Sequence, residues 1–173
     1  MPERIEPLPL VIRVTNNTDE IRYIRYGDFL PRCQYLHGES WNTCRLSLVG
    51  QAMEECIEAN LNTNCCLSVE FDSTVYTLLP GSVREYQWNG TVYEENSNHC
   101  SNSCVCLENA NASVGRYRIS LTVFPSATCT SDDHCDLNTD GTAYAFTTGE
   151  ASIVETEFTL PTTDSEFEMV ITK

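Results

Sequence analysis

Ten cysteines give this 173-residue chain its most distinctive chemistry. An even number of cysteines in a chain of this size is typical of an exported protein with paired thiols, because a reducing cytosol keeps thiols free. Zinc sites usually place their thiols in C-x-x-C pairs, and this sequence has no such pair. We therefore predict up to five disulfides, with the pairing left open. They would use Cys33, Cys44, Cys56, Cys65, Cys66, Cys100, Cys104, Cys106, Cys129 and Cys135.

A second candidate for chemistry is the run Asp136-Leu137-Asn138-Thr139-Asp140-Gly141, which matches the first half of a calcium loop, D-x-[DN]-x-[DN]-G. The Ca²⁺ ligands would be Asp136, Asn138 and Asp140. The twelfth position of the loop, where an EF-hand carries a bidentate glutamate, is Thr147. A polar hairpin turn explains the same residues. Both interpretations stay open, and Ca²⁺ is the only cofactor that we consider for this loop.

Other reactive groups give weaker patterns. The segment Cys100–Cys106 beside His99 has the soft ligands that suit zinc or copper(I), although the same thiols would pair in an oxidising compartment. The sequence contains no G-x-S-x-G or H-E-x-x-H motif, and His37, His99 and His134 all lie in cysteine-bearing segments. We predict no catalytic residues and no enzymatic activity.

Charge narrows the range of partners. Twenty-five acidic residues against ten basic ones give a formal net charge of -15, which repels nucleic acids and anionic lipid surfaces. No apolar run reaches the roughly 20 residues of a membrane-spanning helix. The first residues, Met1–Arg4, lack the pattern of a signal peptide. We expect an extracellular, cell-surface or periplasmic protein whose leader has been removed, or which carries a lipid anchor upstream of Met1.

Alternating apolar and polar residues predict strands along most of the chain. The predicted strands are Leu8–Val14, Ile21–Tyr26, Leu67–Phe71, Val75–Leu79, Val83–Trp88, Gly115–Phe124, Val154–Leu160 and Phe167–Ile171. We expect the first two to form one hairpin and the last two another. Only Val49–Leu61 has helical spacing.

These elements predict an all-β fold: a single antiparallel, immunoglobulin-like β-sandwich over residues 1–173, with one short helical insertion and several disulfides. Three polar segments without periodicity, Pro31–Arg45, Glu94–Cys106 and Ser126–Asp140, carry most of the cysteines. We expect them to be loops that disulfides hold in place.

A resemblance to known proteins lies in Leu79–Gly90, which combines a Pro-Gly turn with an aromatic strand ending in Trp88-Asn89-Gly90, and in the later Gly115-Arg116-Tyr117. These residues resemble bacterial immunoglobulin-like sandwiches, namely the intracellular proteinase inhibitor family and uncharacterised cysteine-rich secreted bacterial proteins. The match covers about a quarter of the chain. It implies the fold and a tight hairpin turn at Asn89-Gly90. The ten cysteines depart from the inhibitor family, so inhibition is not carried over.

A disulfide-stabilised sandwich works by presenting loops on a rigid scaffold, so we predict a binding or structural module of the surface, adhesion or assembly type. Its partner would be a protein or a polysaccharide, or further copies of the chain. The exposed aromatic candidates for binding are Tyr35, Trp41, Tyr93 and Tyr144. Two alternatives remain: a secreted protease inhibitor that uses a loop such as Glu94–Cys106, and a calcium- or transition-metal-binding protein.

Overall fold

A computed structural model describes residues 3–6, 9–25, 31–49, 74–96, 106–129 and 142–172 of the chain. Twelve strands form within these ranges. They are β1 (Leu10–Asn16), β2 (Arg22–Arg25), β3 (Arg32–His37), β4 (Ser40–Leu48), β5 (Thr74–Leu78), β6 (Val83–Asn96), β7 (Cys106–Asn111), β8 (Gly115–Val123), β9 (Ser126–Cys129), β10 (Thr142–Thr148), β11 (Ser152–Leu160) and β12 (Glu166–Ile171).

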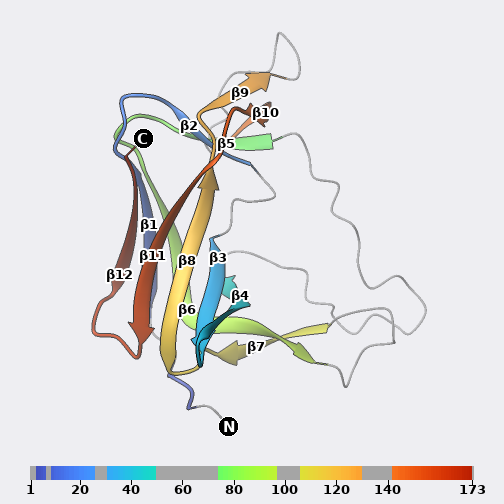
Figure 1. Cartoon of the computed structure of the whole chain (residues 1–173), viewed down its shortest axis with the longest axis vertical. Coiled ribbons are helices and arrows are strands. Elements are labelled where there is room, and N and C mark those ends of the chain that lie inside the picture. Colours follow the sequence, from blue (N-terminus) through green and yellow to red (C-terminus); the bar gives the residue numbers. More distant parts are fainter. Residues whose placement is uncertain are drawn as a thin grey trace, which may run out of the picture.

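The main sheet has eight strands, with the order β11-β8-β3-β4-β6-β1-β12 and with β7 beside β6. Strand β4 belongs to two layers, because Ser40–Cys44 pair with β3 whereas Arg45–Leu48 pair with β6. The sheet therefore curls until it is nearly barrel-shaped, and its end strands β11 and β12 come into contact (Figure 1). Strands β1 and β12 pair in parallel, and the other ladders of the described strands are antiparallel.

A smaller sheet of four strands, with the order β2-β5-β10-β9, lies at one end of the main sheet (Figure 1). A β-bridge between Tyr23 and Phe124 links the two sheets, with reciprocal backbone hydrogen bonds of 2.9 and 2.8 Å. The bridge occurs just where the chain leaves β8 to enter β9. The end of β8 is therefore fixed to both sheets.

The core fills the space inside the curled sheet. Trp88 is 1% exposed, and its ring meets Phe158 edge-on at a centroid distance of 5.9 Å. Phe158 stacks on Phe167 on one side and on Tyr117 on the other, at 4.0 and 5.6 Å. These rings come from β6, β8, β11 and β12, so one aromatic cluster joins both layers.

The prediction of an all-β fold is confirmed for the residues that the structure describes. Strands β8 and β12 bury every second residue as their sequences predict. Two predicted elements, the helix over Val49–Leu61 apart from Val49 itself and the strand Leu67–Phe71, lie outside the described residues. Within the described ranges, no helix has the length and hydropathy needed to cross a membrane.

Both predicted terminal hairpins are wrong. Strand β1 pairs with β6 and β12, whereas β2 joins β5 in the smaller sheet. The fully buried Asn16 directs this separation, because its amide donates hydrogen bonds of 2.9 Å to the carbonyls of Glu20 and Leu78. At the other terminus, β11 pairs with β8 and β12 pairs with β1. Alternation identified these strands correctly but carries no information on their partners.

The predicted hairpin turn at Asn89-Gly90 is also wrong, because β6 continues through it to Asn96. Gly90 takes a positive φ of 78°, and the register with β4 shifts between Leu46 and Leu48, as in a β-bulge. The Trp88 indole N–H donates to the carbonyl of Thr91 at 2.6 Å, and Asn89 Oδ1 accepts from the Thr91 hydroxyl at 2.6 Å. Both bonds span Gly90 and stabilise the bulge within β6.

The segments expected to be loops contain strands. Residues of Pro31–Arg45 form the β3–β4 hairpin, with a two-residue turn at Gly38-Glu39 between the paired His37 and Ser40. Gly38 has a φ of 64°, the conformation that a type II′ turn requires at its first central position. The segment Glu94–Cys106 begins inside β6 and ends at β7, and Ser126–Asp140 begins with β9. Short polar strands lack the apolar alternation on which the prediction relied.

Candidate functional site

The hairpin of β3 and β4 carries two of the four aromatic residues predicted to bind a partner. A disulfide joins Cys33 of β3 to Cys44 of β4, directly across the pair, with a Cα–Cα distance of 4.8 Å. Cys33 is 1% exposed and packs in the core. The disulfide therefore fixes the hairpin to the body of the protein as well as joining its strands.

The two aromatic residues of this hairpin point to opposite faces of the sheet. Tyr35 packs against the core and lies 6.3 Å from the ring of Tyr117, its partner on β8. Trp41 pairs with Leu36, the residue after Tyr35. Because successive strand residues point to opposite faces, Trp41 lies on the outer face. Tyr35 thus acts as a structural residue, and Trp41 is the member of the pair that can meet a partner.

On the outer face, Trp41 lies beside two arginines of β8. The guanidinium carbon of Arg118 lies 4.3 Å from the centroid of a Trp41 ring, and that of Arg116 lies at 6.0 Å. Both arginines are held by Glu157 of β11: Arg118 donates two bonds to Oε1, at 2.6 and 3.0 Å, and Arg116 donates to Oε2 at 2.7 Å. A tryptophan, two guanidinium groups and a carboxylate from three strands thus form one surface cluster.

The charges of this cluster are coupled. Hydrogen bonds from Arg118, and then from Arg116, lower the pKa of Glu157 below its ordinary value of 4.5. Glu157 bonds to both guanidinium groups, and Glu155 lies two positions along β11 on the same outer face. The side chain of Arg116 is 56% exposed and can approach a further anion.

The same outer face continues along β4, which adds a further arginine. Arg45 follows Trp41 and Thr43 at two-residue steps on the outer face and is exposed. Its partner on β6 is Tyr93, another predicted binding residue, which is half-buried and lies opposite Asn109 of β7. Tyr144 lies in β10, where its side chain is outside the described residues. We call Trp41, Arg45, Arg116, Arg118 and Glu157 the arginine–tryptophan face.

The outer face of the other layer is acidic around a single arginine. Arg13 of β1 lies between Glu85 of β6 and Glu166 of β12, and it donates to Glu85 at 2.7 and 3.0 Å. Glu168 accepts a bond from Thr15 at 3.0 Å on the same face. Three carboxylates surround one guanidinium here, which raises the pKa of Arg13, chiefly through its bond to Glu85. Like the chain as a whole, this face carries more acidic than basic residues. Arg13 therefore serves as a control position for variants of the arginine–tryptophan face.

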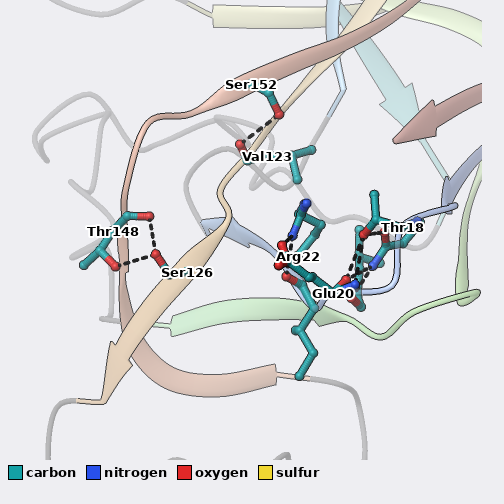
Figure 2. A network of polar contacts seen from close by, with 10 residues as sticks. Thr18, Glu20, Arg22, Val123, Ser126, Thr148 and Ser152 are labelled. Carbon is teal, nitrogen blue, oxygen red and sulfur yellow. Dashed lines mark hydrogen bonds and ion pairs between the residues drawn. The ribbon is translucent and has the colours of Figure 1, made fainter. Parts of the chain in front are cut away.

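A polar network at the junction of the two sheets is structural. Arg22 donates to Glu20 at 2.9 Å, close to Thr18 (Figure 2). The Thr18 hydroxyl donates to Asn16 Oδ1 at 2.8 Å. Ser126 and Thr148 exchange bonds of 3.0 and 3.1 Å across β9 and β10. The first group of bonds orders the connection from β1 to β2, and the second joins the paired strands β9 and β10.

Most of the predicted metal and disulfide residues are not tested. Asp136, Asn138 and Asp140 lie outside the described residues, as do Cys56, Cys65, Cys66, Cys100, Cys104 and Cys135. Cys106 and Cys129 lie in β7 and β9, with side chains outside the described set. Among the side chains that the structure does describe, no group of three His, Cys, Asp or Glu residues could hold a metal ion.

Comparison with protein-family models, with curated proteins and with solved structures found no match for this chain. The assignment of a site therefore depends on the geometry of the chain itself. The sequence pattern missed Arg116, Arg118 and Glu157. The sequence did contain a signal for the two arginines. Arg116 and Arg118 occupy polar positions of the clearest predicted strand, and two arginines so close together are unusual in an acidic chain.

Proposed function

We propose that this protein is an exported, disulfide-stabilised binding module that holds a surface or matrix partner through the arginine–tryptophan face. The observation that carries the proposal is the position of Trp41 on a hairpin that the Cys33–Cys44 disulfide fixes to the core. Ordering a binding residue before the partner arrives lowers the entropic cost of association. A paired cysteine in this place also supports an oxidising compartment.

An immunoglobulin-like arrangement of the strands is part of this proposal. Its support is the hydrogen bond of 2.9 Å from the Tyr117 hydroxyl to the carbonyl of Ser113. A tyrosine near the start of a strand that bonds back to the preceding residues is the tyrosine corner of such sandwiches. The strand in question, β8, lies between β3 and β11, and the outer side of these three strands carries part of the arginine–tryptophan face.

Binding to the cell envelope of the source organism tests the proposal. Envelope and extracellular-matrix fractions would be incubated with the purified oxidised protein, with the W41A/R118A variant and with R13A as the matched control from the acidic face. We expect the native protein and R13A to be retained equally. The retention of W41A/R118A should be lower by about tenfold or more. Equal retention of all three proteins, or no retention of the native protein, would contradict the proposed function. Circular dichroism would first confirm that each variant is folded.

A further inference from the structure

Three Asn-x-Ser/Thr motifs occur in the sequence, the acceptor pattern for N-linked sugars in exported proteins. Their asparagines are Asn16, Asn89 and Asn111. A sugar can be added before or after folding, but in both cases the folded protein must accommodate it. All three asparagines lie in described parts of the chain, so the exposure and the hydrogen bonds of each side chain distinguish them.

The first of these asparagines is closed to such a modification. Asn16 is fully buried, and its amide nitrogen donates hydrogen bonds of 2.9 Å to the carbonyls of Glu20 and Leu78. Its Oδ1 accepts bonds from the N–H and the hydroxyl of Thr18. Both polar atoms of the side chain therefore bond inside the protein. A sugar on the amide nitrogen would displace one of these bonds from a position that solvent does not reach.

The third asparagine, Asn111, lies at the end of β7 and is half-buried. Its backbone carbonyl accepts a bond of 2.8 Å from the guanidinium of Arg4, which also pairs with Glu94 at 2.7 Å. The next residue, Ala112, is 0% exposed. The fold thus places an ion pair beside this motif and buries its middle side chain, which restricts the space around the Asn111 amide.

Asn89 differs from both, because it is exposed on the outer face of β6. Its Oδ1 accepts bonds from the Thr91 N–H at 3.2 Å and from the Thr91 hydroxyl at 2.6 Å. Bonds of this kind, to the residue two positions on, order an asparagine side chain as in an Asx turn. Within the described part of the chain, no group accepts a bond from the Asn89 amide nitrogen. The fold therefore holds the oxygen of this amide and leaves the nitrogen free.

The position of Asn89 also separates it from the proposed binding face. Asn89 follows Glu85 and Gln87 at two-residue steps along β6, which pairs with β1 in the layer that ends at β12. Trp41 lies on the part of β4 that pairs with β3. A sugar chain on Asn89 would therefore leave the arginine–tryptophan face uncovered.

We propose that Asn89 carries an N-linked glycan, which is transferred from a lipid-linked oligosaccharide during export. The bond that forms joins the Asn89 amide nitrogen to the first carbon of the sugar. The bond that breaks joins this carbon to the phosphate of the lipid, which leaves as the free lipid phosphate, and the amide nitrogen gives up one proton. The glycan relies on the export that is part of the proposed function, but it concerns a separate surface of the protein.

Peptide mapping of the protein purified from its source organism tests this proposal. Electron-transfer fragmentation keeps a sugar on its residue and so assigns the modified site. We expect the Asn89 peptide to carry the mass of a glycan and the Asn16 and Asn111 peptides to be unmodified. In the same host, N89Q and T91A should lose the glycan, whereas T91S should keep it because serine also completes the motif. N111Q is the matched control and should keep it. Circular dichroism would confirm that each variant is folded.

Other results would overturn the proposal. The Asn89 peptide of the native protein might carry no sugar mass, or only the mass change of deamidation to aspartate, and either result would exclude the glycan. A glycan that persisted in T91A would show that the motif is not recognised. A glycan on Asn16 or Asn111, with none on Asn89, would show that exposure does not select the site. Envelope retention reports separately on the proposed function: if Asn89 is unmodified and W41A/R118A still loses its retention, the binding module stands without the glycan.

Discussion

The guanidinium carbon of Arg118 lies 4.3 Å from the centroid of a Trp41 ring, and the two side chains come from strands that are not neighbours in the sheet. Strand β3 lies between them, so the contact passes over β3 on the outer face. A cation held over an indole contributes about 0.5–1 kcal/mol at an exposed site. The contact thus orders Trp41 more than it stabilises the fold.

Removal of the Arg118 side chain should expose Trp41 to solvent. Trp88, the other tryptophan, is 1% exposed, so acrylamide should quench mainly the fluorescence of Trp41. We expect R118A to increase this quenching and to shift the emission to longer wavelength. In a W41F background the R118A change should have no effect on the emission. Unchanged quenching in R118A would show that the contact does not shield the indole.

Core packing should dominate the stability of the sheet. Leu121 of β8 is 1% exposed in the main core, whereas Leu79 is 44% exposed beside the Pro80-Gly81 turn. We expect L121A to lower the free energy of unfolding by about 2–5 kcal/mol, because it removes buried methyl groups and leaves a cavity. L79A is the matched control and should change it by less than about 1 kcal/mol. Denaturation in guanidinium chloride measures both, and equal losses would contradict the described core.

The Cys33–Cys44 disulfide should stabilise the protein independently of the other cysteines. The bond closes a loop between residues 11 positions apart, and disulfides typically contribute about 2–4 kcal/mol. We expect the C33A/C44A variant to unfold at a lower denaturant concentration, with a free energy of unfolding smaller by about 2–4 kcal/mol. Non-reducing peptide mapping of the native protein should recover Cys33 and Cys44 in one linked pair. Either cysteine linked elsewhere would refute the described hairpin.

The Glu157 cluster should make a small contribution to stability that depends on pH. Its carboxylate has a lowered pKa in the folded protein, so the contribution is present above the ordinary value of 4.5 and is lost as the pH falls through the folded value below it. The difference in unfolding free energy between native protein and E157Q should therefore shrink on acidification. In the R116Q/R118Q background the E157Q change should show no such pH dependence. A difference that grew on acidification would have the wrong sign.

Strand positions were predictable from sequence to the extent that one face of each strand is buried. Gly115–Val123 and Glu166–Ile171 alternate cleanly, and the structure buries the expected residues. Pairing was not predictable, because long-range contacts decide it. The buried Asn16 resembles turn chemistry in sequence, yet its amide bonds to Leu78, 62 residues away, and separates β1 from β2.

The candidate site was predictable only in part. The choice of aromatic residues expected to be exposed on loops selected Trp41, but it also selected Tyr35, whose register places it against the core. Arg116 and Arg118 meet Trp41 and Glu157 only because β8 lies between β11 and β3, with β4 on the far side of β3. Spacing in the sequence does not reveal this contact, because Arg116 and Arg118 lie 41 and 39 positions before Glu157.

The most direct test of the binding face is an arginine footprint. The chain has nine arginines and a single lysine at its end, so a dicarbonyl reagent followed by mass spectrometry reports on nearly every basic side chain. The protein would be modified alone and when bound to the envelope fraction. We predict that Arg45 and Arg116 become protected on binding while Arg13 and Arg4 react as before. Protection at Arg13, or no change at Arg116 in the bound protein, would contradict the assignment of the arginine–tryptophan face.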